Sequence, residues 1–534
     1  MKTASPSFRE AMTLALTILG TGMAYLDQTA LNVALPAIQR DLQADLTGLQ
    51  WVTDIYILCL AAPMLIGGAL GDRYGRVRVY VVGMMVFVAA SVLGALAPSL
   101  PLLILARALQ GLGGALLIPG SFAIINTGFP PERRGRAMGI WGAFSPIVTL
   151  SGPLIGGWLV DNASWRAVFL LNLPLGLIAV FAARFVTETR DESATGPLDW
   201  PGVSTLLVGL GGLLFGLIEG AHFGWGHPVV LAALLSGAAG LVVFVIVEAR
   251  SSALRSASAP TKPAPVPLLP LWTLRNRTFL GINVLTLIHY FAISSLFFFF
   301  TLNLQQAQRY SAFEAGLMQL PIPIILVLMS NPMGRLIDRT DPRRIIAAGV
   351  LLNALGLMLC GLPGVGGNYW LTFFPAQVVF GVGLGCLVIP LTAVAINALG
   401  TQGSGIASGL NTCVSRIAQM LAVAVFGGVM LAGFRPALEA RIVGLELPAE
   451  ARAQLLAEAR NLGATQPPAG LSAETAAAVD MAVRLAFVDS FRQMMWLSAV
   501  IALLGLALWL AIVWREPNTL AMHNEPLAPE PTAD

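Results

Sequence analysis

Long apolar segments recur along the whole chain and are separated by short polar stretches. A helix needs about 20 apolar residues to cross the hydrocarbon core of a bilayer, so this pattern predicts about fourteen transmembrane helices. Six of them lie within residues 12–186, two more within 203–247 and six within 279–513. We therefore expect an all-α polytopic membrane protein made of two six-helix bundles and two inserted helices.

Two polar segments interrupt the apolar pattern. Residues 250–270 are rich in serine, alanine and proline, which is typical of a linker. Residues 435–480 mix charged residues with alanine and are predicted to form a solvated hairpin or, alternatively, a docking surface for a periplasmic partner. The expected organisation is an N-terminal bundle at 1–190, inserted helices at 191–250, a cytoplasmic linker at 251–276, and a C-terminal bundle at 277–534 with an extracytoplasmic loop at 435–480.

Arginine collects in alternate loops and thereby predicts the orientation of the chain. The positive-inside rule assigns such loops to the cytoplasm. An even number of spans then places both termini there, in a protein of the cytoplasmic (inner) membrane. The residues that carry this prediction are Arg73, Arg76, Arg78, Arg133, Arg134, Arg136, Arg335, Arg339, Arg343 and Arg344.

Composition excludes several classes of protein. The chain is 56% hydrophobic and 11% charged, whereas soluble domains carry roughly 25% charged residues. Its four cysteines lie in apolar segments, its four histidines have no metal-ligand spacing, and no phosphate-binding loop occurs. We expect no enzymatic activity, no metal or cofactor and no nucleic-acid partner. The energy for any transport would come from an ion gradient or from the substrate's own gradient.

Three ionisable residues fall at similar depth within predicted spans, where each costs roughly 2.5–3.5 kcal/mol to insert. They are Asp27, Asp54 and Arg107. An acid at low dielectric that has an arginine nearby can load and release a proton as its surroundings change. We expect Asp27 to carry a proton whose affinity Arg107 sets, although the two residues could instead form a structural ion pair. Asp54 is a candidate for a second proton or for recognition of a cationic substrate, the alternative being an interfacial acid.

Three further polar residues within spans are candidate substrate-binding positions: Glu219, His289 and Arg416. Each also has a structural interpretation. Glu219 would be interfacial, His289 would be hydrogen-bonded within a packed bundle, and Arg416 would bond polar neighbours such as Asn411.

A repeated motif indicates a duplicated fold. Gly-x-x-x-Asp-Arg occurs at residues 68–73 and again at 334–339, each time before a basic turn. Duplicated halves that rock about a central site are how many secondary transporters work. The predicted gate residues are Gly68, Asp72, Arg73, Gly75, Arg76, Asp338 and Arg339.

These motifs resemble those of the major facilitator superfamily, and more narrowly its fourteen-helix drug:proton antiporter family (QacA/EmrB type). Further similarities are the segments at 26–36, 51–56 and 107–111, and the start of span six from Trp165 to Pro174. The antiporter motif of span five matches at Gly139, Gly152, Pro153 and Gly156, while Val148 replaces one expected glycine.

The resemblance implies proton-coupled efflux of lipophilic, cationic drugs or toxic compounds, with Asp27, Arg107 and Asp54 in proton coupling. Its expected partners are the small lipophilic substrate, protons and membrane lipids, together with a periplasmic adaptor if the host has an outer membrane. Two alternatives remain open. One is a dedicated exporter of an endogenous lipid, siderophore or antibiotic, and the other is a non-transporting membrane receptor or scaffold.

Overall fold

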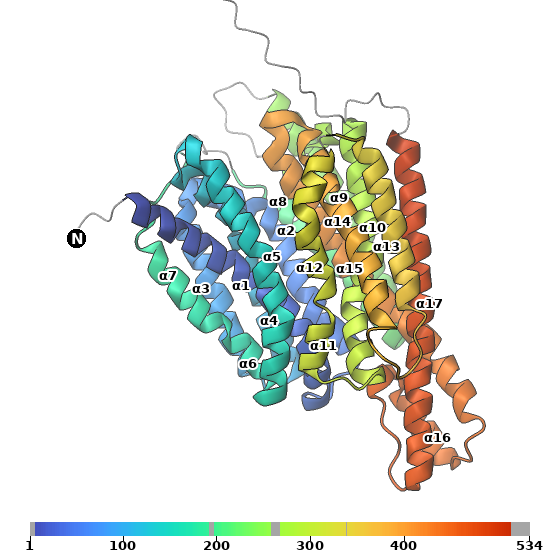
Figure 1. Ribbon diagram of the computed structural model, residues 1–534. Coiled ribbons are helices and arrows are strands. Elements are labelled where there is room, and N and C mark those ends of the chain that lie inside the picture. Colours follow the sequence, from blue (N-terminus) through green and yellow to red (C-terminus); the bar gives the residue numbers. More distant parts are fainter. Residues whose placement is uncertain (1–5, 192–196, 258–266, 338, 514–534) are drawn as a thin grey trace, which may run out of the picture.

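The computed structural model describes residues 6–191, 197–257, 267–337 and 339–513, and the regular elements in these ranges are all helical (Figure 1). The N-terminal half contains α1 (Pro6–Asp41), α2 (Leu46–Tyr74), α3 (Arg76–Ala95), α4 (Leu100–Gly128), α5 (Pro131–Asn162), α6 (Trp165–Leu170) and α7 (Asn172–Ala183). The inserted pair is α8 (Trp200–Phe223) and α9 (Pro228–Ala257). The C-terminal half contains η1 (Leu271–Arg275), α10 (Arg277–Leu302), η2 (Asn303–Ala307), α11 (Ala312–Met318), α12 (Pro321–Ile337), α13 (Pro342–Cys360), α14 (Phe373–Asn397), α15 (Gly400–Ile442), α16 (Ala449–Ala457), η3 (Glu458–Ala464) and α17 (Ala473–Val513).

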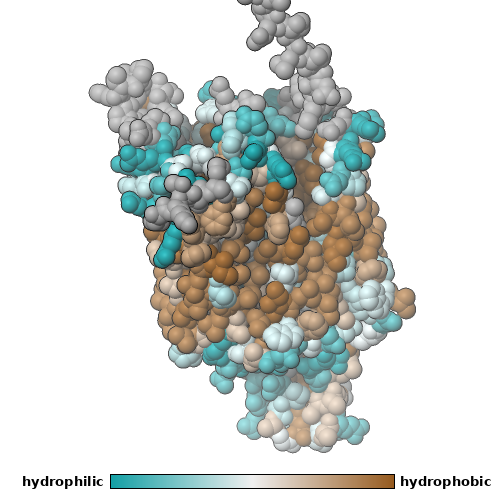
Figure 2. Space-filling model, turned by 60° about the vertical axis from the view of Figure 1, so that its left-hand side comes forward, coloured by the Kyte–Doolittle hydropathy of each residue, from teal (hydrophilic) through white to brown (hydrophobic). Residues whose placement is uncertain are grey.

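The predicted number of membrane helices is confirmed. Thirteen segments of the described chain are long and apolar enough to cross a membrane. The helix α1, 36 residues long, packs against α5 and α7 and brings the total to fourteen. Its mean hydropathy is lower than that of the others because it carries polar residues such as Thr17, Thr21 and Asp27. Figure 2 shows the resulting belt of hydrophobic residues between two hydrophilic ends.

The structure differs from the sequence-based expectation at the two polar segments. The helix α9 continues to Ala257, seven residues into the region assigned to the linker from residue 251. Residues 435–442 extend α15 and residues 473–480 begin α17, at the two ends of the segment predicted to be an extracytoplasmic loop. These extensions are helical because Leu438, Ile442 and Phe487 are buried where the two helices pack together.

The extensions of α15 and α17, with α16 between them, project beyond the rest of the bundle at the bottom of Figure 1. We call this end of the bundle the hairpin end. The opposite end, which carries the loops with Arg73, Arg76 and Arg78, is the arginine end. The inserted helices pack on each other, and α8 also packs against α2 and α15, where the N- and C-terminal halves meet.

One ion pair at the hairpin end fixes the first helix to the sixth span. The carboxylate of Asp41 accepts hydrogen bonds from Trp165 Nε1 at 3.0 Å and from Arg166 Nη1 at 2.6 Å. These two donors hold the pKa of the Asp41 carboxyl below its usual range. The Trp165-Arg166 pair therefore links the start of α6 to the end of α1.

Candidate functional site

The structure brings Asp27 and Arg107 together in the interior of the N-terminal half. Arg107 Nη1 donates to Asp27 Oδ2 at 2.5 Å, and both side chains are buried, with 1% and 0% of their surface exposed. The other carboxylate oxygen of Asp27 accepts from Gln110 Nε2 at 2.9 Å and from Asn172 Nδ2 at 2.8 Å. The ionised form of Asp27 is therefore satisfied by three donors from α4 and α7.

Arg107 is equally well accommodated. Its Nε donates to the carbonyl oxygen of Val52 at 3.2 Å, and its guanidinium lies 4.2 Å from the ring centroid of Tyr56. The hydroxyl of Ser91, on α3, accepts from both Gln110 and Asn172. A closed network of this kind is strengthened by its low-dielectric surroundings and joins five helices. Sequence analysis did not single out Ser91, because an isolated serine in an apolar helix carries no signal.

Asp54 lies in a different environment. On α2 it stands between Gln50, which donates to the Val423 carbonyl oxygen at 2.6 Å, and Ala61, whose carbonyl oxygen accepts from Cys413 Sγ. This face of α2 packs against α15 of the other half. Asp54 is 0% exposed, and neither of its carboxylate oxygens has a hydrogen-bond partner in the described part of the chain. It is thus a buried acid at the contact between the halves.

The three candidate substrate-binding residues do not form one cluster. Glu219 accepts from the indole Nε1 of Trp51 at 2.9 Å, on the side of α2 that faces α8. His289 is buried and contacts Asn353 Oδ1 at 2.9 Å within the C-terminal half. Arg416 reaches across from α15 to Gln28 of α1.

Arg416 bonds polar neighbours as expected, but these are Gln28 and Gln419 and not the suggested Asn411. Asn411 instead donates to Asn283 and Thr286 of α10. The two positions are five residues apart, which turns their side chains by roughly 140° around the helix axis. Arg416 therefore faces α1, while Asn411 faces α10.

The first gate motif forms a compact turn at the arginine end. Asp72 pairs with Arg76 at 2.7 Å. Between them Gly75 has φ +104°, a conformation that glycine adopts without strain. The backbone N–H groups of Val77 and Arg78 donate to the carboxylate of Glu188, which thereby caps the start of α3. Sequence analysis missed Glu188, whose only signal was one acid near the arginine loops.

The second gate motif is described in part. Asp338 lies outside the described residues. Gly334 has open space where a side chain would begin, and Arg339 follows the end of α12. The pairing that closes the first motif is therefore established by the structure for the first repeat only.

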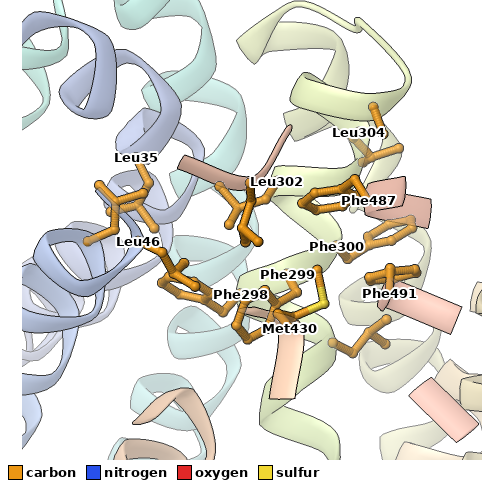
Figure 3. Packing of buried hydrophobic residues seen from close by; sticks show 14 of the residues in the cluster. Leu35, Leu46, Phe298, Phe299, Phe300, Leu302, Leu304, Met430, Phe487 and Phe491 are labelled. Carbon is orange, nitrogen blue, oxygen red and sulfur yellow. The ribbon is translucent and has the colours of Figure 1, made fainter. Parts of the chain in front are cut away.

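The two halves meet tightly at the hairpin end. Asp161, at the end of α5, accepts from the backbone N–H groups of Ala312 and Phe313 at the start of α11. Beside this contact a hydrophobic cluster spans both halves. Figure 3 shows Leu35 and Leu46 of the N-terminal half on one side of Phe298, Phe299, Phe300 and Leu302 of α10, with Phe487 and Phe491 of α17 on the other.

The antiporter motif of α5 supplies close helix contacts in the same region. A Cβ atom on Gly156 would lie 2.8 Å from the Cβ of Ala30 on α1, and one on Gly157 would lie 2.5 Å from the carbonyl oxygen of Ala312. Gly152 also packs directly against α1. Val148, which replaces an expected glycine, lies opposite Gly22 of α1, so the space is provided by the facing helix.

Replacing Gly157 by valine is expected to disfavour closure at the hairpin end. Overpacking costs about 1–3 kcal/mol. This cost corresponds to a change of about 5- to 150-fold in the ratio of the conformation closed at the hairpin end to the conformation open there. Spin labels at Asn162 and Val443, both exposed at this end, would report the change by pulsed electron paramagnetic resonance as a shift to longer distances.

Gly139→Val is the matched control. Gly139 lies on the same helix, but a Cβ atom on it would meet no heavy atom within 4 Å. The substitution should leave the distance distribution unchanged. Identical distributions for Gly157→Val and wild type would contradict the role of this contact in closure.

A cavity of about 1380 Å³ opens at the arginine end. Its wall combines α2 and α4 with the segment before α8, the end of α9, η1 and the start of α15. Gly68, Asp72 and Arg73 of the first gate motif line it, and Thr412 lines its α15 side. Two helical halves that close on each other at one end and leave a cavity at the other have the architecture of a secondary transporter.

Comparisons with known proteins agree with this architecture. The family model described as Major Facilitator Superfamily matches residues 17–201 and 200–423, so the chain belongs to that family. The predicted family is thereby confirmed. A bacterial homolog of the human lysosomal transporter Spinster shares the fold, with a TM-score of 0.62 and 20% sequence identity over 96% of this chain and 98% of that one.

Related sequences are named as resistance and export proteins. The chain is 33% identical to multidrug resistance protein Stp of Mycobacterium tuberculosis, over 80% of this chain and 78% of that protein. It is 30% identical to the tetracenomycin C resistance and export protein of Streptomyces glaucescens, over 96% of this chain and 94% of that protein. The similarity to drug exporters predicted from the motifs is confirmed by these relatives.

Proposed function

We propose that this protein exports lipophilic drugs in exchange for protons. The observation that carries the proposal is the contrast between two buried acids, an Asp27 that is fully paired and an Asp54 that has no partner among the described residues. The names of the relatives, which describe multidrug resistance and export of tetracenomycin C, support efflux as the direction.

The proposed orientation follows from the arginine loops. The positive-inside rule assigns the arginine end to the cytoplasm, with both termini there and the hairpin end outside. In a bacterial host the protein would occupy the cytoplasmic membrane. The cavity at the arginine end then faces the cytoplasm, and the contact between α5 and α11 closes the outer side. A periplasmic adaptor at the hairpin end remains a proposal for a host with an outer membrane.

Asp54 is the proposed carrier of the exchanged proton. An ionised carboxylate without hydrogen bonds in an apolar interior costs many kcal/mol, so a buried acid in such a place stays neutral. A drug exporter that imports protons has to hold its proton in the drug-free, inward-facing conformation. The position of Asp54, sealed between α2 and α15 in this conformation, meets that requirement. Separation of these helices on the outer side would let Asp54 take up a proton from outside. Drug that enters the cavity at the arginine end would then have to open a path from Asp54 to that cavity, so that the proton leaves to the cytoplasm.

The ion pair of Asp27 and Arg107 is proposed to respond to the conformational changes of the same transport cycle. Their network spans α1, α2, α3, α4 and α7, so any rearrangement of these helices changes the number of donors around Asp27. Loss of donors would leave the buried carboxylate of Asp27 without compensation for its charge. Export requires that protons and drug favour opposite conformations, because a ligand shifts an equilibrium only through its differential affinity.

Proton exchange by the wild-type protein tests this function. In proteoliposomes loaded with a pH-sensitive dye, addition of ethidium or puromycin on the side of the arginine end should release protons to that side. Liposomes that carry a variant with bulky side chains at both Gly156 and Gly157, which the contacts with Ala30 and Ala312 exclude, serve as control. The absence of a pH change with any compound of a chemically diverse panel would contradict proton-coupled efflux.

A further inference from the structure

Arg416 is a cation in the middle of the membrane region. It lies on α15, eleven residues beyond Gly405, at which the described membrane span of that helix begins. At a rise of about 1.5 Å per residue it stands about 16 Å from that end, near the midplane of a hydrocarbon core about 30 Å thick. Charged residues at this depth are expensive and mark binding sites or ion pathways more often than surface charges do.

The guanidinium of Arg416 is neutralised by no carboxylate of the described chain. Its Nη1 donates to Gln28 Oε1 at 2.8 Å and to Gln419 Oε1 at 3.2 Å, and both acceptors are neutral amides. Within the described residues its Nε and Nη2 atoms form no hydrogen bond, and neither atom is sealed from solvent. Arg107 differs in both respects, because it is 1% exposed and paired with the carboxylate of Asp27.

The free atoms form one geometric unit. Nε and Nη2 make up the side edge of the guanidinium plane, where two parallel N–H groups match the two oxygens of a carboxylate. The ring centroid of Tyr25 lies 5.7 Å from the guanidinium carbon. Tyr290 of α10 is close enough for the charge of Arg416 to act on it. A guanidinium edge with two free N–H groups beside two aromatic side chains suits an aromatic carboxylate.

Arg416 is not among the residues that line the large cavity, but it lies one helical turn from one that does. Thr412 lines that cavity and precedes Arg416 by four residues, which places the two on the same face of α15, one turn apart. Asp54 and Glu219, the acids that the sequence offered to a cationic drug, are not partners of Arg416: Asp54 is sealed against α15 and Glu219 is bonded to Trp51.

We propose that Arg416 binds an anionic oxygen group of the exported compound, so that the preferred substrates are lipophilic aromatic acids. This inference rests on the proposed drug efflux and names the substrate class for the same cavity. Exchange of one such monoanion outward for one proton inward transfers two net positive charges into the cell in each cycle. An inside-negative membrane potential would therefore drive export together with the pH gradient.

Three analogues with one ring system test the charge preference. They are 9-anthracenecarboxylate, its uncharged carboxamide, and the cationic 9-(aminomethyl)anthracene, each titrated by fluorescence anisotropy against the full chain in phosphatidylcholine nanodiscs at neutral pH. We expect the carboxylate to bind about 10- to 100-fold more tightly than the carboxamide, the range that hydrogen bonds to a charged partner supply. Equal binding of the two, or tighter binding of the amine, would overturn the proposal.

Variants then assign the preference to Arg416. Arg416→Gln should abolish the advantage of the carboxylate and leave carboxamide affinity within about twofold. Arg416→Lys, which keeps the charge but lacks the fork, should retain only part of the advantage. The control is Arg435→Gln, which removes an exposed arginine paired with Glu439 on the same helix. Equal effects of Arg416→Gln and Arg435→Gln would overturn the assignment, and the wild-type comparison stands even if a variant fails to fold.

Three outcomes separate this proposal from others. Displacement of the carboxylate when the nanodiscs contain mostly phosphatidylglycerol would overturn the drug assignment in favour of a lipid headgroup. Proton exchange with uncharged or cationic drugs, combined with equal binding of the three analogues, would overturn the charge preference while drug efflux stands. Binding of the carboxylate without any proton exchange would support the anion site and contradict the proposed coupling.

Discussion

Replacing Asp27 by asparagine will lower the free energy of unfolding by about 3–5 kcal/mol, the cost of removing one partner from a buried ion pair. The cause is Arg107, which is 1% exposed and would keep its charge without a counterion. Thermal unfolding in nanodiscs, followed by tryptophan fluorescence, would show this as a lower midpoint. Asp41→Asn is the matched control: its ion pair with Arg166 is exposed, and exposed pairs contribute about 0–1 kcal/mol.

The double variant Asp27→Asn/Arg107→Gln separates stability from coupling. Removing both charges should recover most of the lost stability, because no uncompensated ion remains. We expect this folded variant to show no drug-driven proton exchange in proteoliposomes. Normal proton exchange by the double variant would mean that the pair is purely structural, and a midpoint of Asp27→Asn equal to that of Asp41→Asn would contradict the energetic argument.

Replacing Asp54 by asparagine will abolish uphill drug accumulation and leave the fold intact. Asparagine has nearly the same shape as a protonated aspartic acid, so it should fit a site where the carboxyl group is buried without partners in the described chain. With a gradient of about two pH units and no membrane potential, one coupled proton sustains about 100-fold accumulation of an uncharged drug. In Asp54→Asn this ratio should fall to about 1, while exchange of labelled for unlabelled drug continues.

Uptake into proteoliposomes under an imposed pH gradient measures this ratio, and counterflow measures exchange. Glu219→Gln serves as control, because Glu219 lies on the neighbouring α8 and its bond with Trp51 survives as a hydrogen bond to the amide oxygen. Undiminished accumulation by Asp54→Asn would place the coupled proton elsewhere, with Asp27 next. A large loss of thermal stability in Asp54→Asn would show that the carboxyl group has a structural partner.

The two acids illustrate how far sequence analysis reached. Both were recognised from their type and depth, since any charge in an apolar helix needs a reason to be there. The pairing of Asp27 with Arg107 was expected from their similar depth, and the structure shows it. The isolation of Asp54 was not foreseen. It depends on the rotation of α2, which turns Asp54 toward α15 together with Gln50 and Ala61.

The same distinction applies to the polar segments. The sequence indicated that residues 435–480 leave the membrane, because charge interrupts the apolar pattern there. It did not indicate that α15 and α17 continue as helices beyond the membrane region. Those extensions exist because Leu438, Ile442 and Phe487 are buried in one hydrophobic cluster. A scan for apolar spans does not detect an amphipathic helix outside the bilayer.

The sequence by itself determined the class of fold, the number of spans, the duplicated gate motif and the residues in which to look for chemistry. These features are local, because the bilayer sets the length and polarity of each helix separately. Only the tertiary structure decided which side chains meet. Asp27 and Asn172 are 145 residues apart, and Gln28 and Arg416 are 388 apart. Such contacts depend on how whole helices rotate and pack against one another, which no single stretch of sequence specifies.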